Sequence, residues 1–458
     1  MIQLISWTKK ILNIKSNNEL KKLFIMSLCL FITIGTYTIV RELKDAIFYL
    51  IVGKSFFPDV KTLSYFFMIP LVLFYTWLSG KIRKHNLLIF YCLVYGIGGC
   101  ITAIFLSNPE IGLYNLTSSG NRLFGWIYYI FLEGYSPFIV SLMWAFFNSS
   151  SKPNDIKKNY IIATMFSKFG GILTSYFAWI FMSKQFIYLH SFSDVQCYVW
   201  LTVITFGIIL LMPILILYLV KTVPEHELYG YTDEIEHNTI NDNNKKKSSS
   251  FGLSELIKSP YVIGMFGMVF FWEVVNVIFN FMRLNIGFDC SDGIADFSAF
   301  LFKNIMYSHI IGLVIVVFGT SFFINIFGEK ISLIMIPIST GLAISSCLLY
   351  PTPEMVLFVY SFISALNYSF ARPLREALYI PTSKDIQFKT KSWIDGFGSK
   401  FSKGIGSIYN KIVINLSSSS SNLIHSMFFS IVIILWIILT YFLGKKWEDA
   451  IKKKEIIK

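Results

Sequence analysis

The chain has 458 residues, of which 54% are hydrophobic and only 15% are charged. A soluble protein carries about 25% charged residues, so this composition excludes a soluble globular chain as well as a disordered one. The net charge of +13 fits an excess of Lys and Arg on cytoplasmic loops and attraction to anionic lipid. The alternative is that some of these cations bind an anionic solute. The class that remains is a polytopic membrane protein.

Twelve apolar segments have close to the length of about 20 residues that a helix needs to cross a bilayer. They are 23–40, 62–79, 87–106, 123–147, 160–182, 198–220, 260–282, 304–326, 330–350, 353–371, 391–416 and 423–443. The segment 391–416 is rich in Gly, Ser and Lys, so it must be shielded by protein or line a wet path. We therefore predict an all-α fold with twelve transmembrane helices in two six-helix halves, of the major facilitator kind.

The charges between these segments predict the orientation of the chain. Placing the N-terminus in the cytoplasm puts most of the 40 Lys and Arg residues on the cytoplasmic side, with Arg283 among the few external ones. The predicted parts are a cytoplasmic segment 1–22, a six-helix bundle 23–220, a cytoplasmic linker 221–258, a second bundle 259–443 and a basic tail 444–458. We expect a monomer in a bacterial inner membrane, multi-pass, with both termini cytoplasmic and the first apolar run retained as a span.

A short repeat relates the fifth span to the eleventh. Ser167 begins the sequence SKFGGI, and Ser399 begins SKFSKGIG, 232 residues later. Chance similarity is the alternative for so short a match, but both copies lie in corresponding spans of two six-span halves. That pattern is typical of parallel-repeat transporters, whose substrate site lies between the halves near mid-membrane.

Charged residues inside apolar segments cost roughly 2.5–3.5 kcal/mol each at mid-membrane, and they usually have a function. If one helix continues past the first span, Arg41, Lys44 and Asp45 share a face, which predicts a cationic site entered from outside. The alternative is an ordinary charge cluster at the membrane interface. Glu133 and Glu273 each stand alone in apolar sequence, as structural partners of buried lysines or as coupling carboxylates.

The two copies of the repeat carry the remaining candidate ligands. Lys168, Lys400 and Lys403 could neutralise phosphate, because an ammonium group is a strong point-charge partner for it. Asn276, one turn from Glu273, could bind a base or a ribose, although helix packing is the commoner role of a lone Asn. The scattered Cys and His residues predict no metal site, and no motif indicates a cofactor or nucleic acid.

Three of these segments together resemble the ATP/ADP translocases of obligate intracellular bacteria and plastids. TIVRELKDAIFYLIVG at 38–53 is similar to the end of the family's first span, and RPLREALYIP with the lysine-rich helix after it, 372–407, is similar to a second family segment. The resemblance implies nucleotide transport. It assigns the family's charged positions to Lys44, Glu133, Glu273, Arg375 and Lys403. Arg375 replaces a lysine and Arg372 an acid, and both are departures from the family pattern.

We therefore predict a transporter that exchanges ATP for ADP by alternating access. Arg41, Lys44, Lys168, Asn276, Arg375, Lys400 and Lys403 are the predicted substrate-binding residues, and Asp45, Glu133 and Glu273 the predicted coupling residues. Aromatic side chains could stack on the base, but the sequence does not indicate which of them do so. The alternatives are net import of nucleotides, NAD or another organic anion, and, more remotely, a polytopic membrane enzyme. An enzyme would need a catalytic loop, and the longest loop, 221–258, has the composition of a linker.

Overall fold

The computed structural model describes most of the chain. Its described residues are 17–79, 81–150, 156–224, 259–350, 352–382, 386, 390–414, 418–453 and 455–457. Most of the predicted linker 221–258 and of the predicted N-terminal segment 1–22 lies outside them. Among the described residues, β structure is limited to one isolated bridge between Thr382 and Ile457, so the fold is all-α as predicted.

The helices follow the apolar segments of the sequence. They are α2 (Asn17–Ile51), α3 (Phe57–Ser79), α4 (Lys84–Leu106), α5 (Leu123–Glu133), α6 (Ser141–Ser149), α7 (Ile156–Met182), α8 (Asp194–Thr222), α11 (Pro260–Asp289), α12 (Ile294–Val314), α13 (Thr320–Leu349), α14 (Pro353–Leu366), α15 (Arg372–Leu378), α16 (Lys391–Trp393), α17 (Ser399–Val413) and α18 (Ser418–Lys453). Short 3-10 segments are η1 (Lys54–Phe56) and η3 (Ile187–Ser191), and π-helical segments are η2 (Ser136–Val140), η6 (Ile315–Gly319), η7 (Asn367–Ala371) and η9 (Ile394–Gly398). Every one of the twelve predicted spans coincides with helix.

Ten helical stretches among the described residues are long and apolar enough to cross a membrane. The two other predicted spans form α7 and α17, both of which carry lysine. Lys168 lies on α7, and the 15 residues of α17 include Lys400, Lys403 and Lys411. Helices with such charges tend to avoid the lipid, which agrees with the requirement for shielding stated for 391–416.

The described residues divide into two compact units. The first takes in those of Met1–Val52, Phe67–Lys247 and Asp292–Met306, and the second those of Gly53–Phe66, Ser248–Ser291 and Tyr307–Lys458. The N-terminal parts of α3 and α12 are therefore grouped differently from the predicted bundles. The predicted domain boundaries stay a prediction.

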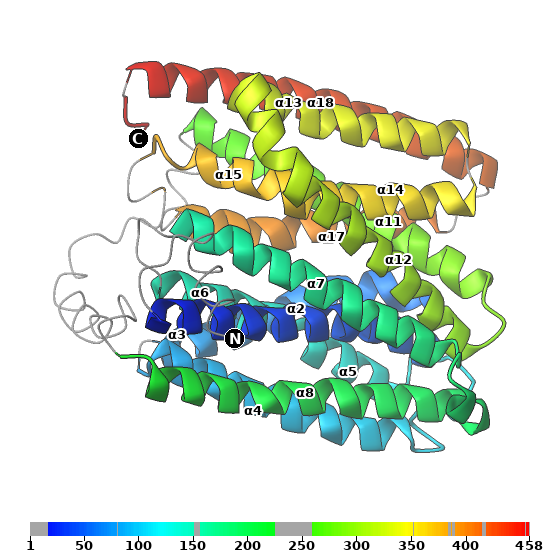
Figure 1. Cartoon of the computed structure of the whole chain (residues 1–458). Helices are drawn as coiled ribbons and strands as arrows, with labels where there is room; N and C mark the ends of the chain where they lie inside the picture. Colours follow the sequence, from blue (N-terminus) through cyan, green and yellow to red (C-terminus); the bar gives the residue numbers. More distant parts are fainter. Residues whose placement is uncertain are drawn as a thin grey trace. The chain divides into compact units, whose positions relative to one another are not determined.

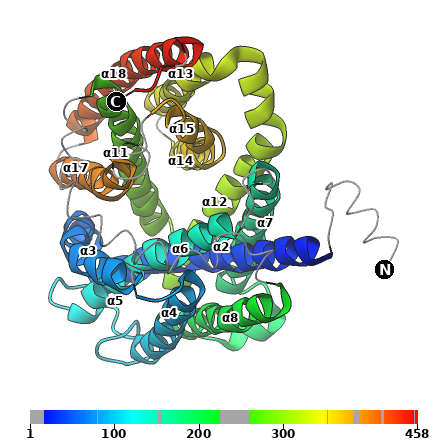
Figure 2. The ribbon, with the colours of Figure 1, turned by 90° about the vertical axis from the view of Figure 1, so that its left-hand side faces the viewer.

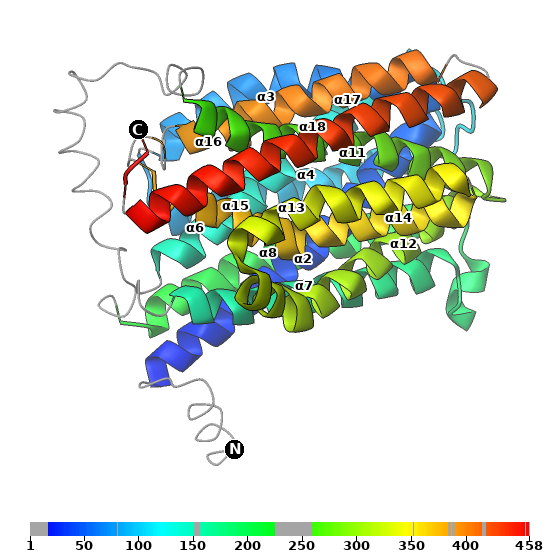
Figure 3. The same ribbon diagram turned by 90° about the horizontal axis from the view of Figure 1, so that it is seen from above.

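Each unit repeats the same pairing of helices. In the first unit α2 packs along α7, and α4 packs along α8 (Figures 1 and 2). In the second unit α11 packs along α17, and α13 packs along α18, a helix of 36 residues that runs without a break (Figure 3). Numbered within each half, the first span packs on the fifth and the third on the sixth. A duplicated six-helix half would produce this order.

Glycines set the closest approach between α2 and α7. A Cβ atom on Gly170 would lie 2.3 Å from the carbonyl oxygen of Phe31, and one on Gly35 would lie 2.7 Å from a side-chain carbon of Thr174. Thr174 Oγ1 also donates a hydrogen bond to the carbonyl of Gly35, at 3.0 Å. Small residues at helix contacts are how membrane helices gain packing contacts without a hydrophobic driving force.

Two sharp changes of chain direction occur at glycines with positive φ. Gly53, with φ of 112°, lies between α2 and α3, and Gly328, with φ of 72°, kinks the chain within α13. Glycine adopts this backbone region without the steric cost that a Cβ imposes. The kink at Gly328 separates the eighth span from the ninth, so no loop is needed between them.

Candidate functional site

The first cluster of charges lies on α2 in the first unit. The 35-residue helix continues without interruption to Ile51, so the condition for a shared face of Arg41, Lys44 and Asp45 is met. Lys44 and Asp45 are buried, and Arg41 is half-buried. The charges therefore lie within a packed bundle and not on an exposed interfacial end.

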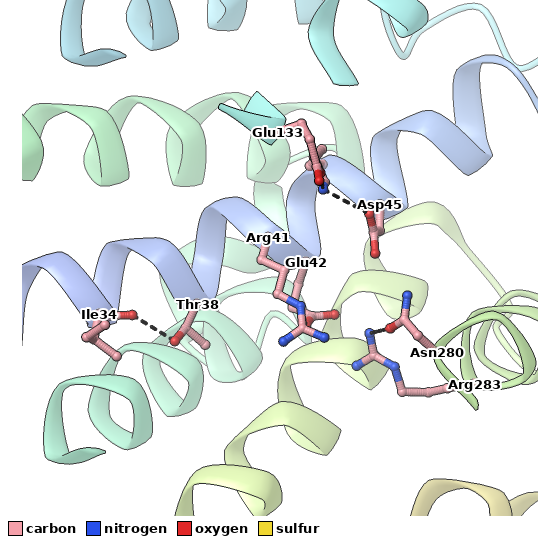
Figure 4. Close-up of polar contacts among 9 residues, drawn as sticks. Ile34, Thr38, Arg41, Glu42, Asp45, Glu133, Asn280 and Arg283 are labelled. Atoms are coloured by element: carbon pink, nitrogen blue, oxygen red, sulfur yellow. Dashed lines mark hydrogen bonds and ion pairs between the residues drawn. The ribbon is translucent and has the colours of Figure 1, made fainter. Parts of the chain in front are cut away.

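Lys44 contacts three side chains of the first unit. Its ammonium group forms an ion pair and hydrogen bond with Glu133 Oε2, at the end of α5, and lies 3.6 Å from Asp45 Oδ1 (Figure 4). The ammonium also lies 4.3 Å from the centroid of the Tyr129 ring, within cation–π range. A buried charge needs such compensation, because desolvation costs several kcal/mol per ion. The structure thus brings Lys44, Asp45 and Glu133 together, and the contact between Lys44 and Glu133 is one that the sequence left open.

A neighbouring pair completes this cluster. Arg41 Nε lies 3.7 Å from Glu42 Oε1, and the Glu42 side chain is only 1% exposed. Figure 4 shows Arg41, Glu42 and Asp45 projecting from one stretch of α2. The sequence prediction did not include Glu42. The sequence could have indicated Glu42, because it lies between Arg41 and Lys44 in a helix that continues past the predicted end of the first span.

The second cluster lies where α11 packs on α17, in the second unit. Glu273 Oε1 accepts a hydrogen bond from Ser399 Oγ at 2.6 Å and lies 3.6 Å from Lys403 Nζ. The other oxygen, Oε2, is buried and has no hydrogen-bond partner among the described residues. Ser399 was not predicted as a site residue, although it begins the repeated sequence. Glu273 thus has one oxygen that accepts a hydrogen bond and a second, buried oxygen without a hydrogen-bond donor among the described residues.

The other predicted ligands of the second unit lie around this pair. Arg375, on α15, interacts electrostatically with Asp395 and Glu273. Lys400 Nζ lies 5.5 Å from the centroid of the Tyr65 ring, and Asn276 is half-buried on α11. Lys168 is buried on α7 in the first unit. A site formed jointly by Lys168 and the lysines of α17 stays a prediction.

Arg283 is the main correction to the sequence prediction, which placed it in an external segment. The helix α11 extends to Asp289, so Arg283 lies inside it and is fully buried. Its Nη2 donates a hydrogen bond to Asn280 Oδ1 at 3.0 Å (Figure 4). Its guanidinium carbon lies 4.3 Å from the centroid of the Tyr360 ring. The signal missed was a continuous helical pattern past residue 282.

No group of three or more His, Cys, Asp or Glu side chains able to hold a metal ion occurs among the described residues. The buried charges alternate in sign and are carried by lysine, arginine and carboxylate side chains on membrane-spanning helices. Such an arrangement can bind an anionic solute by exchanging an internal carboxylate for the solute's phosphate oxygens. Carriers are the class of membrane protein that this arrangement defines.

Comparison with solved structures identifies the fold. The chain is similar to the xylose transporter XylE from E. coli in an inward-open conformation, with a TM-score of 0.59 and 13% identity over 91% of this chain and 95% of that one. A POT family transporter in complex with 5-aminolevulinic acid gives a TM-score of 0.62 and 12% identity over 93% and 96%. The nucleoside transporter NupG gives 0.52 and 14% over 93% and 99%. The fold is therefore that of major facilitator transporters.

Sequence comparison identifies the family. The family model described as TLC ATP/ADP transporter matches residues 2–106 and 302–447, more than half of the chain. The chain belongs to this family, and it is a nucleotide transporter. Lys44, Arg375 and Lys403 lie within the matched residues, whereas Glu133 and Glu273 lie between the two matched segments. A comparison with functionally curated proteins finds no match.

Proposed function

We propose that this transporter imports ATP in exchange for ADP by alternating access. The observation that supports the proposal is that each unit holds one lysine–glutamate ion pair with one buried and one half-buried member, Lys44 with Glu133 and Glu273 with Lys403. In the empty carrier each glutamate neutralises its lysine. A bound nucleotide would replace that carboxylate with phosphate oxygens, so occupancy changes which ion pairs exist.

This replacement links binding to conformational change. A ligand can shift an equilibrium between two states only through its different affinity for them. Carboxylates released from Lys44 and Lys403 would no longer hold the contacts between α2 and α5 and between α11 and α17. The nucleotide thereby permits the transition that the empty carrier resists. Such a requirement for occupancy is what makes a carrier an exchanger.

We place the remaining candidates in supporting roles. Arg41, Lys168, Arg375 and Lys400 add positive charge along the path of the phosphates, Asp45 assists Glu133, and Asn276 binds ribose or base. Exchange leaves both nucleotides chemically unchanged, so no catalytic step and no cofactor is required. We further propose that the protein is a monomer in a bacterial inner membrane with both termini in the cytoplasm.

The test is uptake of labelled ATP into proteoliposomes that contain the purified protein. We expect uptake with ADP inside the vesicles and little uptake into empty vesicles. Equal uptake into empty vesicles would instead indicate net nucleotide import. No uptake in either case would favour NAD or another organic anion, each tested as a competing substrate in the same vesicles.

A further inference from the structure

The face of α2 that carries the positive charges also carries an aromatic ring. Tyr37, Arg41 and Lys44 follow one another at spacings of four and three residues, so they lie along one side of the helix. Lys44 lies seven positions after Tyr37 along the helix, a rise of about 10 Å. In a nucleotide, the ribose and first phosphate separate the base from the terminal phosphates by a comparable span.

Tyr37 stacks on a ring that is fixed in place. Its ring centroid lies 6.2 Å from that of Tyr135, with an angle of 8° between the rings. The Tyr135 hydroxyl is hydrogen-bonded to Thr36 Oγ1 at 2.7 Å, and Tyr95 meets the Tyr135 ring edge-on at 5.6 Å. Tyr95 and Tyr135 are buried, whereas Tyr37 is half-buried. Tyr37 is thus the accessible end of an ordered aromatic stack.

One turn of chain connects this stack to the charged cluster. Glu133, which pairs with Lys44, is followed by Gly134 and Tyr135, just before the π-helical segment η2. A Cβ atom on Gly134 would lie 2.2 Å from the Tyr95 hydroxyl, so glycine is needed for Tyr95 to approach. The same turn therefore positions both the partner of Lys44 and the support of Tyr37.

We propose that Tyr37 binds the nucleobase by stacking, with Tyr135 as the positioning residue behind it and Lys44 holding the phosphates. This inference rests on the proposed function, and it defines which part of the substrate each side chain recognises. Stacking between a base and an aromatic ring depends on the faces of the rings and not on hydrogen-bond pattern. The Tyr37 subsite accordingly favours nucleotides over phosphate compounds without a base, and discriminates weakly among bases.

The experiment separates recognition of the base from recognition of the phosphates. ATP uptake is measured in ADP-loaded vesicles, with inorganic tripolyphosphate as an inhibitor that lacks a base. We expect Tyr37→Ala to raise the KM for ATP between about 5-fold and 100-fold, the range for loss of one stacked base, and to leave inhibition by tripolyphosphate within about twofold of wild type. Tyr37→Phe and Tyr37→Trp should retain a KM near that of wild type.

Two further variants keep the test decisive. Tyr37→Leu gives a side chain close in volume to that of Tyr37→Phe, but without an aromatic face. A KM for ATP that is raised in Tyr37→Leu and unchanged in Tyr37→Phe therefore reports stacking, even if Tyr37→Ala folds poorly. Tyr114→Ala changes an exposed tyrosine in the loop after α4 and should behave as wild type. An unchanged KM in Tyr37→Leu, or equal weakening of ATP and tripolyphosphate, would overturn the inference alone. A wild-type protein that neither binds nor exchanges ATP would overturn the proposed function as well.

Discussion

Lys44 contacts Asp45 on α2 and Glu133 and Tyr129 on α5, so its replacement should lower both stability and transport activity. Removing one member of a buried pair typically costs about 3–5 kcal/mol, because the other charge stays buried without compensation. We expect Lys44→Ala to abolish ATP uptake and to lower the thermal stability of the detergent-solubilised protein. The double variant Lys44→Ala with Glu133→Gln should regain much of the stability without regaining uptake. Normal uptake by well-inserted Lys44→Ala would contradict a role in substrate binding.

Glu273 allows a sharper separation of charge from hydrogen bonding. Glu273→Gln can still accept the hydrogen bond from Ser399 Oγ, but it cannot neutralise Lys403. We expect exchange to slow on the order of tenfold, equivalent to about 1.4 kcal/mol, with little loss of stability. Ser399→Ala is the matched control, since it removes the hydrogen bond and keeps the charge, and its exchange rate should stay closer to that of wild type. Equal rates for Glu273→Gln and wild type would make Glu273 a structural residue.

The sequence predicted the charged residues of the site better than their partners. Lys44 and Glu133 are conspicuous because charge is rare in apolar segments, and their different spans left open whether they meet. Their contact depends on the antiparallel packing of α2 and α5, which no local pattern reveals. Tyr135 and Arg283 were missed for different reasons. Tyr135 is one of 25 tyrosines, and its position two residues after Glu133 does not reveal that its ring packs on Tyr37. Arg283 was assigned to an external segment because the predicted span ended seven residues before α11 does.

At the scale of elements, the contact between α2 and α7 offers a test of packing. A methyl group on Gly170 would lie 2.3 Å from the backbone carbonyl of Phe31, which cannot rotate away. We expect Gly170→Ala to destabilise the protein by about 1–3 kcal/mol, the usual cost of overpacking, measured as a lower melting temperature in detergent. Gly207→Ala on α8 is the control, because no atom lies within 4 Å of its added Cβ. A melting temperature unchanged in Gly170→Ala would mean that the two helices separate without cost.

The twelve helices were predictable because bilayer thickness fixes their length, and the breaks within them were not. Apolar length alone locates both ends of α4 and α8 to within four residues, whereas α18 continues ten residues past its predicted span. It cannot show that the fourth and tenth spans each contain a π-helical turn, η2 and η7, because a π-helical turn has the same apolar composition as the α-helix around it. Both turns lie in corresponding spans. The two halves of the chain therefore resemble each other in backbone geometry at this position, in addition to the short sequence repeat.

For the whole molecule, the predicted orientation can be tested with a cysteine already present. Cys290, at the end of α11, is exposed, whereas Cys29, Cys92, Cys197 and Cys347 are buried. With both termini in the cytoplasm, α11 runs outward and places Cys290 on the external side. We therefore expect a membrane-impermeant maleimide to label intact cells that express the protein, and Cys290→Ser to remove most of that labelling.

The opposite side supplies the control for this experiment. Lys221 is exposed near the end of α8, where the predicted orientation places the cytoplasm. In the Cys290→Ser background, Lys221→Cys should react only after the membrane is permeabilised. Labelling of Lys221→Cys in intact cells, together with protection of Cys290, would invert the orientation. In an inverted chain, the face predicted to take up nucleotide from outside would instead be in contact with the cytoplasm. The proposed direction of ATP transport would then be reversed.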